Sequence, residues 1–171
     1  MPFTFPFSKL LSFRSKQATL SGIFITDAAG RPMQSRTTAM AISDQGLEDD
    51  RYYSKTGYWD PVEGCQVTLI TEHDLTLASR GNDLNFDKGQ HRRNLVIKGI
   101  KTKSLEGKEF RIGDAIFSYD KPRPPCGYLN KIEGKGMALA LSYNSGICIR
   151  VIQSGKISIH DPVEILPGSN K

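Results

Sequence analysis

Residues 109–117 read Glu-Phe-Arg-Ile-Gly-Asp-Ala-Ile-Phe and carry the clearest local fold signal in the chain. Two short apolar runs, residues 110–112 and 115–117, flank the pair Gly113-Asp114. Glycine followed by aspartate between two such runs is typical of a tight turn that joins antiparallel strands. This stretch therefore predicts a β-hairpin.

Short apolar runs separated by turn residues continue on both sides of this hairpin. Further strands are predicted at residues 22–25, 33–43, 66–70, 94–97, 146–152 and 156–159. The first two are expected to pair across the turn at 27–32. A helix is predicted from Glu72 to about Arg80, with Thr71 as its cap and Gly81 at its end, and another at 136–143. Strands and helices do not alternate regularly, so the pattern favours a single mostly-β domain, a barrel with flanking helices, over a doubly wound sheet.

Composition limits the function classes. The chain has 171 residues and a formal net charge of +5, but the charge is segregated along the sequence. Residues 44–74 hold eight acidic side chains and two basic ones, whereas residues 88–111 hold eight basic and two acidic ones. This segregation fits a local positive field for a small anionic ligand at least as well as a nucleic-acid surface. The sequence also lacks an aromatic and basic strand platform, so we expect no nucleic-acid partner.

Cysteine count and hydropathy indicate the compartment. Three cysteines are an odd number, which argues against a closed disulfide framework and for a reduced, cytoplasmic location. No stretch approaches the roughly 18 apolar residues that a transmembrane helix requires. The apolar residues 1–13 contain Pro2 and Pro6 and lack the pattern of a signal peptide, so we expect this extension to pack on the domain rather than to anchor it to a membrane.

Cys126 is the most informative of the three thiols. It follows Arg123-Pro124-Pro125 and precedes Gly127, in a stretch whose prolines stiffen the backbone and remove amide donors. A nearby arginine and a following short helix would both favour the thiolate, which can bind a soft metal or carry a sulfur atom. The alternative is a rigid turn around a packed cysteine. Cys65 and Cys148 lie in apolar runs and are interpreted as buried structural residues.

Two cationic segments accompany this cysteine. His91-Arg92-Arg93-Asn94 stands directly before a predicted strand, where adjacent side chains would point to opposite faces, so only one arginine is expected at a given site. A guanidinium suits bidentate contacts to phosphate, although a solvated basic edge is the alternative. Residues 46–51, Gly-Leu-Glu-Asp-Asp-Arg, could position Arg51 at the site or form only a tight turn with an arginine–carboxylate pair.

The order of these segments resembles the MOSC domain, the module named for the C-terminal part of molybdenum cofactor sulfurases. The resemblance covers roughly residues 19–166, with 1–18 as an N-terminal extension and 167–171 as a C-terminal tail. It rests on an ordered series of segments and on no single motif. The quoted segments are GLEDDRYY at 46–53, QVTLITE at 66–72, RRNLVIKGI at 92–100, EFRIGDAIF at 109–117, RPPCGYL at 123–129, GMALAL at 136–141 and GICIRVIQSGKISIHDPV at 146–163.

The resemblance implies a β-barrel with flanking helices and a molybdenum cofactor of the molybdopterin type. In reductase members of the family a cysteine ligates molybdenum, and Cys126 falls on that position. Arg92 and Asn94 fall on the segment that touches the pterin phosphate, and Thr71 falls on the strand-to-helix corner nearby. The residues around these positions add Arg51 and Arg123 as candidate cofactor contacts.

The implied activity is an oxidoreductase that reduces N-hydroxylated small molecules with electrons from a separate redox partner, since the sequence has no flavin or iron–sulfur motif. The alternative is sulfur transfer, in which Cys126 takes a persulfide from a cysteine desulfurase for a metal–sulfur centre. Two positions depart from the family pattern. Asp49 replaces a usual glycine, which is tolerable if the backbone there has a positive φ. Tyr128 replaces a usual histidine, so any role of that histidine is lost or passes to Tyr128.

Overall fold

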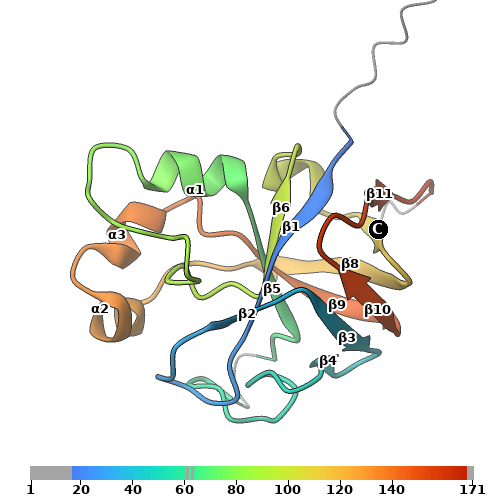
Figure 1. Ribbon diagram of the computed structural model, residues 1–171, viewed down its shortest axis with the longest axis horizontal. Coiled ribbons are helices and arrows are strands. Elements are labelled where there is room, and N and C mark those ends of the chain that lie inside the picture. The colour runs from blue at the N-terminus through green and yellow to red at the C-terminus, as the bar shows by residue number, and fades with distance from the viewer. Residues whose placement is uncertain (1–16, 61, 63, 169–171) are drawn as a thin grey trace, which may run out of the picture.

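The computed structural model describes residues 17–60, 62 and 64–168. Within these residues, helices gather at one end of the molecule and strands curve around a core at the other (Figure 1). Residues 1–16 of the predicted extension and 169–171 of the predicted tail lie outside the described residues. The strands are β1 (Thr19–Ile25), β2 (Gln34–Arg36), β3 (Thr38–Ile42), β4 (Gly46–Leu47), β5 (Val67–Thr71), β6 (Leu95–Lys98), β7 (Glu109–Ile112), β8 (Ala115–Pro122), β9 (Ile147–Gln153), β10 (Gly155–Ser158) and β11 (Val163–Ile165), and the helices are α1 (Glu72–Ala78), α2 (Gly127–Glu133), α3 (Met137–Leu141) and the 3-10 turn Thr102–Leu105.

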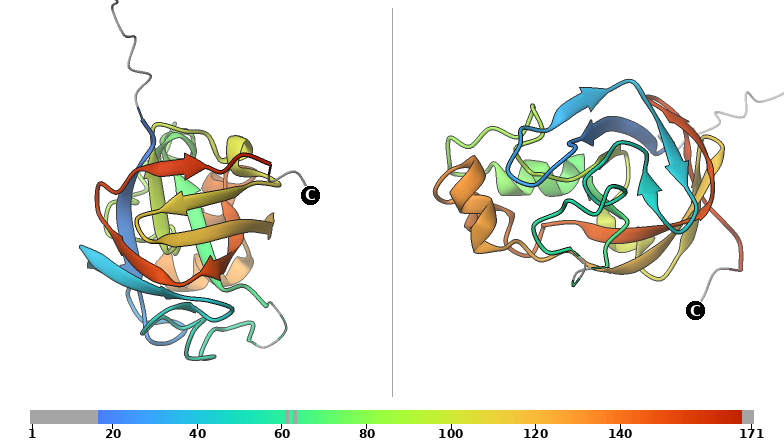
Figure 2. Two further views of the ribbon diagram at one scale, coloured as in Figure 1. Left: turned by 90° about the vertical axis from the view of Figure 1, so that its right-hand side faces the viewer. Right: turned by 90° about the horizontal axis from the view of Figure 1, so that it is seen from below.

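The main sheet has eight strands in the order β11-β7-β8-β9-β5-β6-β1-β2, and a second sheet has the order β10-β3-β4. The pairs are antiparallel except β5–β6, which α1 connects as a parallel crossover. The main sheet curves back on itself, and both views of Figure 2 show its strands wrapped around the interior. The Val163 amide donates to the Ala18 carbonyl at 2.8 Å, which brings the β11 edge against the start of β1. No regular ladder closes the ring in the described residues, but the mostly-β class is confirmed.

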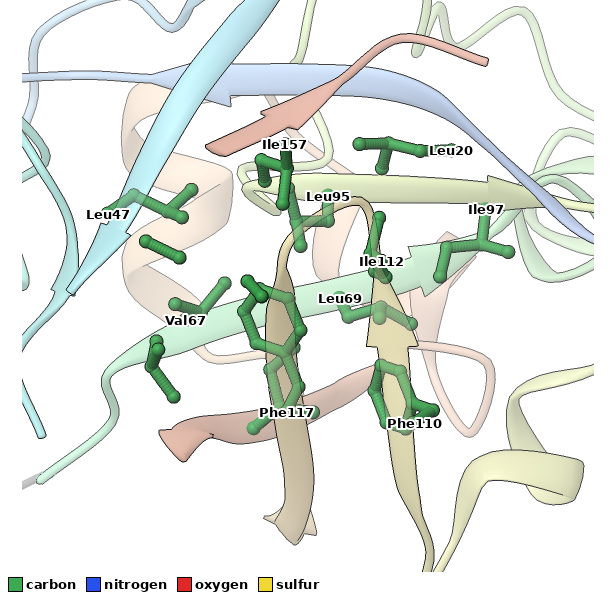
Figure 3. Close-up of a cluster of buried hydrophobic side chains, with 14 of the residues drawn as sticks. Leu20, Leu47, Val67, Leu69, Leu95, Ile97, Phe110, Ile112, Phe117 and Ile157 are labelled. Atoms are coloured by element: carbon green, nitrogen blue, oxygen red, sulfur yellow. The ribbon is translucent and has the colours of Figure 1, made fainter. Parts of the chain in front are cut away.

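The core fills the interior of the curved sheets. Side chains from alternate strand positions meet there, and Figure 3 shows how they interdigitate. Phe110 and Phe117, directly opposite each other on β7 and β8, stack with centroids 6.0 Å apart. A second apolar cluster, which includes Phe24 and Ile70, packs the helices against the outer face of the sheet. The protein therefore has one core inside the sheet and a smaller one under the helices.

The hairpin at residues 109–117 is confirmed, with Ile112 paired to Ala115 across the turn. The hairpin of the first two strands is also confirmed, but the strand predicted at 33–43 is wrong in its extent. It divides at Thr37 into β2, which pairs with β1, and β3, which pairs with β10 in the other sheet. Local alternation predicts an extended segment, but the change of partner sheet depends on residues more than 100 positions away.

Thr71 caps α1 as predicted. Its hydroxyl accepts the Asp74 amide at 3.2 Å, and the helix ends at Ala78, two residues before the predicted end. The helix predicted at 136–143 is present as the shorter α3, and α2 begins directly after Cys126. No helix in the described part of the chain is long and apolar enough to cross a membrane. The starts of α1 and α2 place Thr71 and Cys126 at the helical end of the sheet.

Candidate functional site

Cys126 opens onto a small cavity at the helical end of the sheet. It is the N-cap residue of α2, has extended backbone angles, and makes no capping hydrogen bond with its side chain. The thiol is partly exposed, and the cavity has a volume of about 50 Å³. The neighbouring Pro124 and Pro125 form the rim. The backbone therefore presents this thiol to the cavity without committing it to a structural contact.

Four guanidinium groups line the same cavity: Arg51, Arg92, Arg93 and Arg123. The expectation that only one of the adjacent Arg92 and Arg93 would face the site is wrong. Arg92 has a φ of 60°, so this segment is a left-handed turn and does not alternate as a strand would. Both side chains consequently reach the cavity. Burial lowers the pKa of each, although a guanidinium remains protonated in proteins.

Arg93 is held by neutral groups. Its Nε donates to the Ser145 carbonyl at 2.7 Å, and one terminal nitrogen donates to the Ser145 hydroxyl at 2.5 Å. The other terminal nitrogen of Arg93 donates to the His91 carbonyl at 3.1 Å. The residue is only 4% exposed, and within the described residues it has no carboxylate partner. A buried cation without an acidic partner is costly, so an anion in the cavity would stabilise it.

Arg51 and Arg92 each have one carboxylate neighbour. Asp50 lies 3.3 Å from Arg51, and Glu133 on α2 lies 3.2 Å from Arg92. The Arg51 guanidinium also donates to the Arg92 carbonyl at 3.0 Å and stands over the Tyr52 ring. No carboxylate lines the cavity itself among the described residues. The local balance is therefore cationic, and the cavity favours an anionic ligand.

Asn94 and Thr71 do not line this cavity. Asn94 is fully buried, and its side chain binds the backbone of Phe24 and Thr68 and the carboxylate of Asp50. The Thr71 hydroxyl is engaged with Asp74. The structure therefore brings Cys126, Arg51, Arg92 and Arg123 together, while Asn94 supports the turn behind Arg51 and Thr71 supports α1.

Aromatic residues also line the cavity, and no local sequence signal indicates the contact between them. Tyr58 stacks on Tyr128 with ring centroids 3.7 Å apart, and Trp59 lies edge-on to Tyr58. Tyr58 and Trp59 remain 53% and 46% exposed. Tyr128, which stands where the family pattern has histidine, is therefore the residue on which Tyr58 stacks. Arg93 and Tyr52 are further lining residues that the sequence interpretation did not select.

The other two thiols form a buried pair beside the arginines. Cys65 and Cys148 share one cluster with Tyr52 and are almost inaccessible. Burial raises the pKa of Cys65, and its hydrogen bond to Cys148, together with Arg123, lowers the pKa of Cys148. Among the described residues no group of three or more metal-ligating side chains occurs. Cys126 is thus the accessible thiol of the three.

Asp49 has a φ of 67°, which meets the condition under which aspartate is a tolerable replacement for the usual glycine. Asp49 is exposed, whereas the next residue, Asp50, is buried and accepts the amides of Thr26 and Tyr52 at 3.2 and 3.1 Å. The tight turn at 46–51 thereby fixes the Asp50–Arg51 pair. Residues 46–51 therefore form a tight turn with an arginine–carboxylate pair and also place Arg51 at the cavity.

His91 gives a pH dependence to stability. Burial, reinforced by Arg93, lowers the pKa of His91 to about 3, whereas an unfolded histidine titrates near 6.5. Because the unfolded state binds the additional proton, stability falls as pH decreases from 7 towards 3. From this residue we expect a loss of about 2 kcal/mol between pH 7 and pH 5. Urea unfolding at both pH values should show this loss, and the His91→Asn variant, which does not titrate, should lack it; an equal loss in both proteins would contradict the assignment.

The family model for the MOSC domain matches residues 62–164. The chain belongs to the MOSC domain family. The match runs from just before β5 to β11, and includes Cys126 and three of the four cavity arginines. Arg51 lies outside it, and the fold brings it to the same cavity.

Solved structures share this fold. The YuaD protein from Bacillus subtilis is 15% identical with a TM-score of 0.72, over 87% of this chain and 95% of that one. YiiM from Geobacillus stearothermophilus is 18% identical with a TM-score of 0.64, over 90% and 79%. YiiM from Escherichia coli is 23% identical with a TM-score of 0.58, over 86% and 69%. No curated protein matches the chain. These likenesses support the MOSC fold.

Proposed function

We propose that this MOSC protein binds a molybdenum cofactor of the molybdopterin type, with Cys126 as the protein ligand to molybdenum. The observation that carries the proposal is a partly exposed thiol in a cavity lined by four arginines and no carboxylate among the described residues. A thiolate is a soft ligand that suits molybdenum, and guanidinium groups suit a phosphate. We take residues 19–166 as the functional unit.

The donor set fits the two ends of such a cofactor. Cys126 would hold the metal, while Arg93, with Arg51, Arg92 and Arg123 around it, would hold the phosphate. The cavity of about 50 Å³ has room for a small anion but not for a pterin. Tyr58 and Trp59 must therefore move from Tyr128 to admit the whole group. The lost ring stack would cost about 1 kcal/mol, which binding of a dianion to paired guanidinium groups can offset.

The bound cofactor would supply two-electron chemistry at molybdenum. The protein's own groups bind and orient it: Ser145 fixes the Arg93 fork, and Asp50 fixes Arg51. Tyr58 and Trp59 would cover the site and exclude water. For a reductase, the exposed face beside these aromatics is where a small N-hydroxylated substrate would enter. Electrons would come from a separate redox partner, because the sequence has no flavin or iron–sulfur motif.

Reduction of benzamidoxime tests this proposal. The protein expressed in a host that makes the cofactor should convert benzamidoxime to benzamidine with reduced methyl viologen as electron donor. The Cys126→Ser variant should lose at least about 100-fold of this rate, since a ligand to the reacting metal is removed. A folded, molybdenum-loaded protein that leaves benzamidoxime unreduced would rule out the reductase activity while leaving cofactor binding intact.

Sulfur transfer is the second candidate, and the small size of the cavity favours it. A desulfurase persulfide is compact: the Cys126 thiolate would attack its outer sulfur, form the new S–S bond and release the desulfurase thiolate. After incubation with a cysteine desulfurase and cysteine, mass spectrometry should find one added sulfur atom on the peptide that contains Cys126. No gain, or a gain only on another cysteine, would rule this function out.

A further inference from the structure

A larger groove lies away from the Cys126 cavity, between β1, β6, α1 and the loop that follows α1. Its volume is about 690 Å³, within the range of small-molecule sites. Ser21 and Gly22 of β1 and Val96 of β6 form its base, and the loop at residues 82–87 forms one side. Neither Cys126 nor any of the four arginines of its cavity lines this groove. The groove is therefore separate from the site described above.

Three carboxylates line this groove: Glu72, Asp83 and Asp87. No ion pair within the described residues engages any of them. The exposed basic residues of this region, Arg80 and Lys88, do not line the groove. This local negative charge contrasts with the net +5 of the chain. A cation would be attracted to the groove by this charge.

A buried hydrogen-bond donor provides an independent indication of a ligand. His91 lines the groove and is fully buried. Its Nδ1 accepts the Arg93 amide at 2.9 Å, and its lowered pKa keeps the ring neutral, so Nε2 carries the proton. Nε2 has no hydrogen-bond partner in the described structure. His91 thus contributes a buried, unpaired N–H to the residues that line the groove, and leaving such a donor unpaired is costly.

The wall around this donor is apolar. Phe24 stands perpendicular to the His91 ring with centroids 5.2 Å apart, and Leu75, Phe86 and Val96 complete the surface. An aromatic ring is at most a weak acceptor for the imidazole N–H. A ligand that satisfies this groove therefore needs an apolar body and an acceptor for Nε2, with a positive charge for the carboxylates.

We infer that the groove is a binding site for a small amphipathic organic amine, whose ammonium group pairs with Glu72, Asp83 and Asp87. The amine's apolar body packs on Phe24 and Phe86, and its hydroxyl or carbonyl oxygen accepts the His91 Nε2 proton. Residues 91–93 form the wall between the two sites: His91 faces the groove, and Arg92 and Arg93 face the Cys126 cavity. The inference does not depend on the function proposed for Cys126.

Phenylalaninol is the probe that tests this inference, because it combines an ammonium group, a hydroxyl and a phenyl ring. Titration of the full chain, followed by calorimetry and by NMR of the His91 ring, should give a dissociation constant on the order of a millimolar or tighter. N-acetylphenylalaninol, which keeps the ring and hydroxyl but has no charge, should bind at least about tenfold more weakly. No binding of phenylalaninol at saturating millimolar concentration, or equal binding of both compounds, would overturn the inference.

Variants locate the binding. Asp83→Asn and Asp87→Asn are exposed changes that should leave the fold intact and weaken binding by about threefold to tenfold each. His91→Asn keeps an acceptor for the Arg93 amide but cannot place an N–H at the position of the imidazole Nε2, and should weaken binding by about tenfold. Asp49→Asn, a remote acidic control, and Cys126→Ser should leave it unchanged. Binding that is insensitive to both groove carboxylates, or that depends on Cys126, would contradict the assignment even if His91→Asn fails to fold.

Discussion

Replacing Asp50 with alanine is expected to lower the free energy of unfolding by about 3–5 kcal/mol. Asp50 is fully buried and accepts four hydrogen bonds, from the amides of Thr26 and Tyr52 and the side chains of Arg51 and Asn94. Alanine would remove the acceptor of the Thr26 and Tyr52 amides and the carboxylate that neutralises the buried Arg51 charge. Urea denaturation of the purified variant at pH 7 measures the loss.

The neighbouring Asp49 provides the matched control. It is exposed and, among the described residues, takes no part in this network, so Asp49→Asn, which tolerates the positive φ, should change stability by less than about 0.5 kcal/mol. A similar small change for Asp50→Ala would show that this buried network does not hold the turn at 46–51. Contacts other than the one to Asp50 would then have to hold Arg51 at the Cys126 cavity.

The Gly146→Ala variant is expected to lose about 3 kcal/mol or more of stability, since it adds strain to a steric clash. Gly146 has a φ of 83°, and a Cβ built on it would lie 2.1 Å from the Leu69 carbonyl oxygen. That oxygen belongs to β5, which pairs with β9 directly after Gly146. Because backbone cannot rotate away as a side chain can, the strands must separate. Thermal and urea unfolding should both report the loss.

Gly107→Ala is the control for backbone conformation alone. Its φ of 66° is also in the left-handed region, but no atom lies within 4 Å of an added Cβ. We expect a loss of about 1–2 kcal/mol from this strain. Equal effects at the two glycines would mean that the close approach of Gly146 to β5 is not needed. The contact matters for the site because the adjacent Ser145 holds Arg93.

Local sequence signals predict the elements and the pairing of neighbouring strands in a hairpin, but not the pairing of distant segments. The 109–117 hairpin and the Thr71 cap depend on neighbouring residues, and both were predicted. The stacking of Tyr58 on Tyr128 joins segments 70 positions apart, and no local pattern indicates it. The same is true of the strand that divides at Thr37, whose second half is paired by β10.

The candidate site shows the same division. Residue chemistry selected Cys126, Arg51, Arg92 and Arg123, which the fold brings to one cavity. Alternation along a strand predicts that only one of the adjacent Arg92 and Arg93 faces the site. The positive φ of Arg92 removes that alternation, and a positive φ at an arginine cannot be anticipated from its type. Asn94 was selected for the cofactor, but its full set of buried hydrogen bonds serves the turn that carries Asp50.

Molybdenum content tests the central claim most directly. The wild-type protein, purified from a host that makes the cofactor, should contain close to one molybdenum atom per chain by plasma mass spectrometry. Cys126→Ser should fold and contain only background metal. Cys65→Ser, in which the hydroxyl can replace the thiol's hydrogen bond to the Val67 carbonyl, should retain the wild-type content. Folded wild-type protein without molybdenum, or equal loading of Cys126→Ser and wild type, would contradict the account.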